Sequence, residues 1–178
     1  YLLLDDTDIV TGRHLTKIPK AVEEVCQSLD YTPSAVMICI TCVDALLGTD
    51  MDRVCRKSSD RAGVPVVPCY MYALTREKRL PPMASVRKSV YSLLKPRKRK
   101  SDEVNILGYF SPLQEDCELY SLLKSAGVKT IRELSRCESF EEYEKMSQAN
   151  FSLVLNTEAR YAAQQMEQEL NIPFIELA

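Results

Sequence analysis

Histidine is almost absent from this chain: His14 is the only one in 178 residues. Zinc sites built from several histidines, and catalysis by a pair of histidines, are therefore excluded within it. No apolar run approaches the roughly 18 consecutive residues that a membrane-spanning helix needs, and no basic stretch leads into an apolar signal region. The sequence thus predicts neither a membrane span nor a membrane partner.

Motifs that cradle phosphate are also missing. There is no G-x-G-x-x-G sequence and no P-loop, so no nucleotide site is predicted. The formal net charge of −2 gives no reason to expect a polyanionic partner. Five of the six residues from Lys95 to Lys100 are basic, but no aromatic or basic surface elsewhere supports them. We interpret this segment as a solvated connector, with a nucleic-acid-binding patch as the weaker alternative, and expect no nucleic-acid partner.

The chain begins at Tyr1 inside an apolar run, without an initiating methionine, and ends in what reads as a strand. We therefore expect a piece of a larger protein, in which a functional site can be incomplete. Seven cysteines without a secretory signal are typical of a reducing compartment, so a cytoplasmic protein is expected. The cysteines would then be free thiols, small buried hydrophobic side chains or metal ligands.

Apolar runs alternate with helical patterns in the first half of the chain. Residues 35–40 form a continuous apolar run, typical of a strand covered on both faces. The helical stripe 51–62 is bounded by Asp50 or Thr49 as its cap and by Gly63 as its stop. Further elements expected here are helices at 18–29 and from Pro82 to about Leu94, and a strand at 64–68.

The second half repeats this alternation. Ser111 and Pro112 are typical of a helix start, and that helix is predicted to run to Ser125. Ser139 and Glu142 match a capping box at the start of another helix. The remaining predicted elements are strands at 103–110, 128–134, 151–155 and 172–177, and a helix at 157–170.

Strands that alternate with helices of about 10 to 15 residues predict βαβ units and parallel sheets. The expected fold class is therefore α/β, with two Rossmann-like lobes whose parallel sheets are flanked by helices. We assign residues 1–95 to part of a first domain, 96–101 to a basic linker and 102–178 to a middle domain. In such sheets ligands bind beyond the carboxyl ends of the strands, which places Cys42, close behind a central strand, at a functional edge.

Cys39 and Cys42 form a C-x-x-C pair, which can hold a metal or exchange disulfides. Such a pair supplies two ligands, whereas structural zinc or an iron–sulfur cluster usually takes four, and no second C-x-x-C exists. Strand residues an odd number apart point to opposite faces. We therefore expect Cys39 to be buried with Met37, and Cys42, the first residue past the strand, to be the better metal ligand.

The other cysteines are weaker candidates. Cys55 and Cys26 lie on apolar helical stripes and are expected in the core. Cys69 ends a strand and is the alternative second ligand, while Cys117 and Cys137 have no evident partner.

Two acidic clusters could bind a cation. They are Asp5, Asp6 and Asp8, and Asp44, Asp50 and Asp52. For the first cluster a solvated loop is the preferred interpretation. In the second, one carboxylate is expected to cap the following helix, and Gly48 is expected to permit a tight turn.

Taken in order, these segments resemble the component 1 proteins of nitrogenase and their relatives. In that superfamily an Asp-Ile-Val-x-Gly-like segment starts a helix, a strand then delivers a cysteine, and a Leu-Ile-Gly-Asp-Asp-like turn and a Val-Pro-Val strand follow. Later segments, VNILGYFSP, SFEEYEKMSQANFSLVLN and ELNIPFIEL, are similar to the middle Rossmann-like domain. The matching residues of the first part are Asp8-Ile-Val10 with Gly12, then Cys42, Leu46-Leu47-Gly48, Asp50 and Val64-Pro-Val66.

The resemblance implies a role for Cys42. In the family, the cysteine at this position is a ligand of an iron–sulfur cluster between two homologous subunits. The other ligands come from segments upstream of Tyr1 and from the partner subunit, and electrons arrive from an ATP-dependent iron protein. The resemblance therefore implies a homologous component 1-type subunit and the iron protein as partners. It also implies a cluster in the full-length complex that this chain alone does not hold.

Other positions depart from the pattern of catalytic nitrogenase. There, the residue after one strand of the middle domain is a cysteine that binds the iron–molybdenum cofactor, whereas this chain has Asn156. A histidine-bearing segment also lines that cofactor, and residues 70–86 here contain no histidine. Dinitrogen reduction with the usual cofactor is therefore not expected. We instead expect Asn156 and Thr157 to be cofactor-binding residues, beside a substrate bound between the lobes.

Three hypotheses on function follow. The leading one is a fragment of a nitrogenase component 1-like oxidoreductase subunit, which takes low-potential electrons through the cluster at Cys42 and reduces an unsaturated substrate. The first alternative is a scaffold for the assembly of a nitrogenase-type metal cofactor, which hands the cofactor on. The second alternative is a non-catalytic α/β binding module. The isolated fragment is expected to be inactive.

Overall fold

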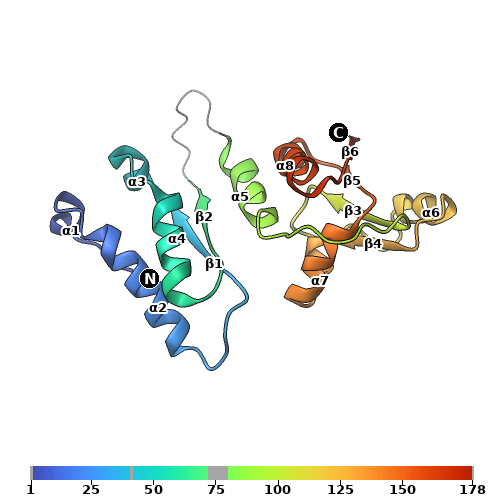
Figure 1. The fold of residues 1–178 in the computed structure, drawn as a ribbon. Helices are drawn as coiled ribbons and strands as arrows, with labels where there is room; N and C mark the ends of the chain where they lie inside the picture. Colours follow the sequence, from blue (N-terminus) through green and yellow to red (C-terminus); the bar gives the residue numbers. More distant parts are fainter. Residues whose placement is uncertain (1, 41, 72–79, 178) are drawn as a thin grey trace. The chain divides into compact units, whose positions relative to one another are not determined.

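The computed structural model describes residues 2–40, 42–71 and 80–177. The chain divides into two compact units, residues 1–77 and residues 78–178 (Figure 1). Both units contain parallel strands with helices packed on them, so the predicted α/β class is confirmed. In the described part of the chain, none of the helices is long and apolar enough to span a membrane.

The first unit is built around a parallel pair of strands. Its described elements are α1 (Asp6–Val10), α2 (His14–Ser28), β1 (Val36–Ile40), α3 (Cys42–Leu47), α4 (Met51–Ala62) and β2 (Val66–Tyr70). Helices α2 and α4 lie side by side (Figure 1). Their apolar stripes bury Ile18, Met51 and Val54 with Ile40 of β1. Burial of such side chains contributes about 1.5–3 kcal/mol each, so this cluster fixes both helices against the strands.

The ends of α4 are set by its local sequence. Asp50 accepts a hydrogen bond from the backbone nitrogen of Arg53 at 2.9 Å, and Gly63 ends the helix with φ 70°. This left-handed conformation favours glycine because other side chains are strained there. The predicted cap, helix and stop are therefore confirmed. The following strand, β2, lies two residues later than the pattern 64–68 predicted.

The predicted burial of Cys39 is wrong. β1 and β2 pair in parallel with Cys39 opposite Cys69, and alternate residues face opposite sides of the pair. Ile38 and Ile40 face the helix cluster, and Ile40 is 1% exposed. Cys39 faces the other side and is exposed, while Met37 is half-buried. The continuous apolar run predicted cover on both faces, but α2 and α4 cover the face that carries the isoleucines.

The second unit carries a parallel sheet in the order β4-β3-β5-β6. Each pair of neighbouring strands in this sheet is parallel. Asn105 of β3 lies opposite Arg132 of β4 on one side and Ser152 of β5 on the other. The described elements are α5 (Pro82–Tyr91), β3 (Glu103–Leu107), α6 (Glu118–Ser125), β4 (Thr130–Glu133), η1 (Leu134–Arg136), α7 (Phe140–Glu144), η2 (Lys145–Gln148), β5 (Phe151–Val154), η3 (Thr157–Ala159), α8 (Arg160–Leu170) and β6 (Phe174–Glu176).

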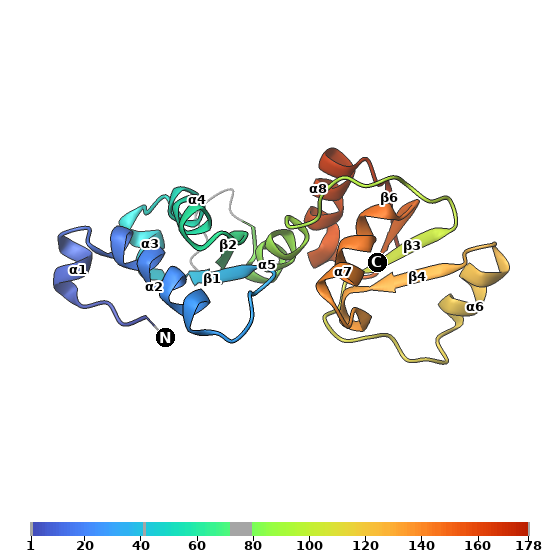
Figure 2. The same ribbon diagram turned by 60° about the horizontal axis from the view of Figure 1, so that its bottom comes forward.

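Separate hydrophobic cores cover the two faces of this sheet. On one face, Leu107 and Val154 pack against α5, α7 and α8. On the other, Val104 and Leu153 pack with residues of α6. Figure 2 shows α7 and α8 together on one side of the strands, away from α6. Parallel sheets require such cover because their strands are apolar on both faces.

The predicted helix start at Ser111 is wrong, because α6 begins only at Glu118, although the helix ends at Ser125 as predicted. Glu133, at the end of β4, gives the physical reason. Its carboxylate accepts a hydrogen bond from the backbone nitrogen of Leu113 at 3.0 Å. The carbonyl oxygen of Leu113 in turn accepts a hydrogen bond from Arg136 at 2.8 Å. Side chains distant in the sequence thus bind the backbone that a helix at this point would use.

Helix α5 packs in the second unit, although the sequence pattern placed residues 1–95 in the first domain. Its Tyr91 is buried in the core shared with α8. The basic segment 96–101 follows the surface of the same unit, where Arg97 forms an ion pair with Glu144 at 2.6 Å. The boundary between the two units therefore lies before α5. The packing of the apolar side chains of this helix sets the boundary, and the charged segment 96–101 does not.

Candidate functional site

Cys42 lies at the carboxyl edge of the strand pair in the first unit. It begins α3, close behind the end of β1 at Ile40. β2 ends at the same edge, because the backbone nitrogen of Met71 donates to the carbonyl oxygen of Ile40 at 3.3 Å. The Cys42 thiol is exposed. A group bound beyond this edge can therefore reach it, as the rule for parallel sheets requires.

The donor set around Cys42 is incomplete. Within residues 2–40, 42–71 and 80–177, no group of three or more His, Cys, Asp and Glu side chains could hold a metal ion. Iron–sulfur clusters are usually held by four cysteines. Cys42 fits the chemistry of one such ligand, and the described part of this chain does not supply the others. The side chain of Asp44, a candidate carboxylate, lies outside the described residues.

The remaining cysteines have less suitable surroundings. Cys55 is buried on α4, as predicted, and its burial and the charge of Asp52 raise the pKa of its thiol to about 12. Cys69, the alternative second ligand, is 4% exposed. Burial raises the pKa of the Cys137 thiol, which donates to the carbonyl oxygen of Glu133 at 3.4 Å. A raised pKa disfavours the thiolate, which is the form that binds metals. The thiols of Cys26 and Cys117 are half-buried.

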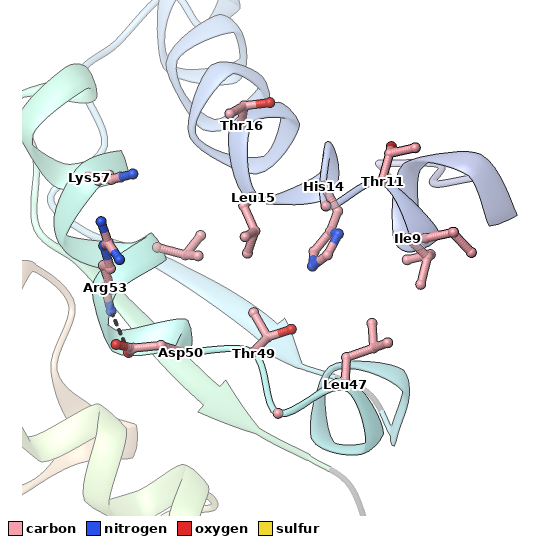
Figure 3. Close-up of a pocket in the computed structure, with 14 residues that line it drawn as sticks. Ile9, Thr11, His14, Leu15, Thr16, Leu47, Thr49, Asp50, Arg53 and Lys57 are labelled. Carbon is pink, nitrogen blue, oxygen red and sulfur yellow. Dashed lines mark hydrogen bonds between the residues drawn. The ribbon is translucent and has the colours of Figure 1, made fainter.

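A groove of about 700 Å³ opens beside the turn that follows α3 (Figure 3). The connections between α1 and α2 and between α3 and α4 line it, together with the first turns of α4. Leu15 of α2 and Leu47 of α3 extend into it, and Arg53 and Lys57 border it from α4. Gly48 turns the chain here with φ 66°, as predicted. Apolar walls with cations at one end suit a ligand that has an apolar body and an anionic group.

His14 lines the groove and is 5% exposed. Its Nδ1 lies 3.2 Å from the carbonyl oxygen of Asp8, and its Nε2 has no hydrogen-bond partner among the described residues. Asp8 is itself buried and pairs with Lys17, whose hydrogen bond lowers the pKa of the carboxyl. Asp5 and Asp8 form a capping box at the start of α1. The predicted solvated loop is therefore wrong, and these carboxylates hold a helix end.

Asn156 and Thr157 lie at the carboxyl end of β5 in the second unit. Oδ1 of Asn156 caps η3 by accepting a hydrogen bond from the backbone nitrogen of Glu158 at 2.9 Å. β3 ends beside it, because the backbone nitrogen of Leu155 donates to the carbonyl oxygen of Leu107 at 2.8 Å. Asn156 is half-buried and Thr157 is exposed. Both residues thus lie at a strand edge of the kind that binds ligands.

Arg87 of α5 contacts the segments that follow β3 and β5 at this second edge. Its guanidinium donates to the carbonyl oxygen of Gly108 at 2.9 Å and to that of Met83 at 3.1 Å. It also pairs with Glu158 at 2.8 Å and lies 4.7 Å from the ring centre of Phe110. The side chain is 5% exposed. A buried charge persists only when it is paired and hydrogen-bonded, and Arg87 meets both conditions.

The sequence patterns did not single out Arg87. It lies with Ala84 and Tyr91 on the buried stripe of α5. An arginine at a core-facing position of an apolar stripe is the signal that could have found it, because arginine is almost never fully buried unless it is paired. Its partners Gly108 and Glu158 follow β3 and β5, and no local spacing brings them together.

Fold and strand edges together define an α/β protein that can bind ligands beyond the carboxyl ends of parallel strands. Residues 2–178 match the family model of the nitrogenase component 1 type oxidoreductases, and the chain belongs to that family. The resemblance seen in the sequence is thereby confirmed.

Relatives with curated names extend this result. The nitrogenase iron-molybdenum cofactor biosynthesis protein NifE of Rhizobium meliloti (strain 1021) is 30% identical over 173 residues, which are 95% of this chain and 36% of that protein. The NifE protein of Nostoc sp. (strain PCC 7120) is 27% identical over 177 residues, 97% of this chain and 36% of that protein. The nitrogenase molybdenum-iron protein alpha chain of Methanosarcina barkeri is 26% identical over 180 residues, 98% of this chain and 33% of that protein.

Solved structures share the fold. Nitrogenase Cp1 at pH 6.5 matches with a TM-score of 0.68 at 23% identity, covering 97% of this chain and 34% of that one. Nitrogenase Cp1 at pH 5 matches with a TM-score of 0.70 at 22% identity, covering 97% and 35%. The chain therefore spans about a third of the length of the relatives that it matches.

Proposed function

We propose that the protein that carries this chain helps to assemble a nitrogenase-type iron–molybdenum cofactor. The similarity of nearly the whole chain to the NifE proteins of Rhizobium meliloti and Nostoc, which are named for biosynthesis of that cofactor, carries this proposal. It favours the scaffold hypothesis over the electron-accepting oxidoreductase that the sequence patterns put first.

The chemistry of Asn156 supports release of a cofactor. Thiolates are strong ligands for iron, and the resemblance puts a cofactor-binding cysteine of catalytic nitrogenase at this position. A carboxamide is a far weaker ligand, and that of Asn156 already accepts a hydrogen bond from Glu158. A scaffold has to give up what it holds, so a weak donor at this edge suits it better than a thiolate.

The exposed thiol of Cys42 supports the second part of the proposal. Cys42 would be one ligand of an iron–sulfur cluster shared with a homologous subunit, and the cluster would supply electron-transfer chemistry when bound. Cys42 lies exposed at a strand edge, which suits a thiolate that binds a cluster whose other ligands are not among the described residues. An ATP-dependent iron protein is the proposed second partner.

An oxidoreductase subunit is the second candidate. The 26% identity to the nitrogenase molybdenum-iron protein alpha chain of Methanosarcina barkeri favours it. The residues near Asn156 and Thr157 would then bind a substrate that is reduced in place, and the protein would turn over instead of handing a cofactor on.

Release of the cofactor is the step to measure. The full-length protein and its homologous subunit, isolated anaerobically and loaded with iron–molybdenum cofactor, are mixed with cofactor-free nitrogenase component 1. Asn156→Cys is expected to slow transfer by about tenfold or more, because an added thiolate–iron bond stabilises the loaded state. Asn156→Ser, which keeps a capping oxygen, is the matched control and should transfer like the wild type. Equal rates in both variants and the wild type would contradict a role for Asn156 in release.

A further inference from the structure

Cys39 and Cys69 are direct neighbours across the strand pair of the first unit. The parallel register of β1 and β2 places their Cα atoms opposite each other. Paired residues project from the same face of a sheet. Both thiols therefore lie on one face of the strand pair, and Ile40 lies on the other face. Neighbouring strands lie about 4.8 Å apart, and this spacing falls within the Cα separations of about 4.4–6.8 Å that disulfides bridge.

The two thiols differ in their access to solvent. Cys39 is exposed, whereas Cys69 is 4% exposed. Burial raises the pKa of the Cys69 thiol, and the neighbouring Cys39 thiol raises it further by its charge and by a hydrogen bond. These effects agree with the strand register, which places the two thiols next to each other. An accessible thiol beside a buried one is the arrangement in which the first reacts with an oxidant and the second resolves the product.

Among the described residues, the other thiols lack such a partner on a paired strand. Cys26 lies on α2 and Cys55 on α4, and Cys117 and Cys137 lie in the second unit. Cys42 is close to Cys39 in sequence but begins α3, beyond the end of β1. The C-x-x-C spacing would suggest a bond between Cys39 and Cys42, whereas the register of the strands favours Cys69.

We propose that Cys39 and Cys69 form a thiol–disulfide exchange site that takes low-molecular-weight disulfides such as glutathione disulfide. The Cys39 thiolate attacks one sulfur of the glutathione disulfide, and one glutathione thiolate leaves. The Cys69 thiol gives its proton to solvent and attacks the Cys39 sulfur, and the second glutathione thiolate leaves. Both cysteines are oxidised to one disulfide, and one glutathione disulfide is reduced to two glutathione thiols.

The bond has a consequence for Cys42. It joins β1 to β2 one residue before the end of β1, and therefore holds the edge at which Cys42 begins α3. Because Cys39 is then bonded to Cys69, it cannot form a disulfide with Cys42. Cys42 then stays a free thiol. The proposal stands on the strand register and does not depend on the proposed function.

Tryptic mapping tests the pairing. The reduced chain of 178 residues is incubated without oxygen in mixtures of reduced and oxidised glutathione, alkylated and digested. Cys26, Cys39 and Cys42 share the peptide 21–53, whereas Cys69 lies in the peptide 62–76. The expected product is a cross-link between the two peptides, assigned to Cys39 by fragmentation, with Cys42 still open to alkylation. A disulfide within 21–53, or no protein disulfide while Cys42 becomes glutathionylated, would overturn the proposal.

Serine variants test the order of the steps. Cys69→Ser is expected to accumulate glutathione on Cys39, because no second thiol resolves the mixed disulfide. Cys39→Ser is expected to leave Cys69 reduced, since a buried thiol does not reach glutathione disulfide. Cys117→Ser, in the second unit, is the matched control and should give the wild-type cross-link. Oxidation of Cys69 at the wild-type rate in Cys39→Ser would contradict the assignment of Cys39 as the attacking thiol.

Discussion

Gly108 lies against the backbone of Asn156. A Cβ atom on Gly108 would be 3.0 Å from the backbone nitrogen of Asn156 and 3.2 Å from its Cβ, and Gly108 has φ 153°. The residues that follow β3 and β5 therefore approach each other so closely that a side chain at position 108 would press on the backbone of Asn156. This contact sets the spacing of the strand ends at which Asn156 and Thr157 are predicted to bind a cofactor.

Alanine at position 108 is expected to destabilise the protein by about 1–3 kcal/mol. The new methyl group has to displace the backbone of Asn156, and a positive φ is strained for alanine. Urea unfolding measures the loss. Ser111→Ala, at an exposed position of the following segment, is the control and should change stability by less than about 0.5 kcal/mol. Wild-type stability of Gly108→Ala would show that the close approach is absent.

Arg87→Met is expected to cost about 1–3 kcal/mol, because the carbonyl oxygens of Gly108 and Met83 lose their hydrogen-bond donor. Arg87→Lys should recover only part of this loss, since lysine has no planar fork of donors. Thermal or urea unfolding gives both values. The neighbouring Lys88, which is exposed on the same helix, provides the control variant Lys88→Met. Equal stability of Arg87→Met and Lys88→Met would contradict the structural role of the buried guanidinium.

Glu103 is expected to make stability depend on pH. Burial alone would raise the pKa of its carboxyl, but ion pairs with Lys100 at 2.7 Å and Arg132 at 3.2 Å outweigh burial and lower it. A carboxyl whose pKa falls on folding stabilises the protein above its unfolded pKa of about 4.3. That contribution is lost as the pH falls through the folded pKa.

Glu103→Gln should therefore cost about 1–3 kcal/mol at neutral pH, and the difference from the wild type should shrink as the pH falls below about 4.3. Urea unfolding at a series of pH values measures this. Glu167→Gln, at an exposed position of α8, should leave the pH dependence of the wild type unchanged. A difference between Glu103→Gln and the wild type that is constant with pH would refute the coupling.

Asp50→Ala is expected to destabilise the first unit by about 1 kcal/mol, because the first turn of α4 loses the acceptor for the backbone nitrogen of Arg53. Asp50→Asn keeps an acceptor oxygen and should restore most of the loss. Arg56→Ala, at an exposed position inside the helix, tests for general effects on α4. Urea unfolding separates the three variants, and equal stability of the alanine and asparagine variants at position 50 would count against the cap.

Elements with local causes could be predicted from the sequence. The cap at Asp50, the stop at Gly63 and the start of α5 at Pro82 each depend on atoms within a few residues, and the structure has all three. Parallel pairing also followed, because alternating strands and helices allow few other connections. The rule that ligands bind at the carboxyl ends of strands directed attention to Cys42 and Asn156, and the structure has both at such edges.

Features with long-range causes could not be predicted. Ser111 has the chemistry of a cap, but Glu133 binds the nearby backbone from another strand. The exposure of Cys39 depends on which face of β1 the helices cover, and an apolar run does not reveal this. The bonds of Arg87 depend on the packing of α5 in the second unit, whereas the charge pattern suggested a boundary at residues 96–101.

Transfer of cofactor tests the central claim most directly. The full-length protein with its homologous subunit is incubated with cofactor-free nitrogenase component 1, and the activity gained by component 1 is measured beside the protein's own ATP-dependent reduction of substrate. The account predicts that component 1 becomes active while the protein itself does not turn over. Turnover of substrate by the protein, with no activation of component 1, would contradict assembly and favour the oxidoreductase.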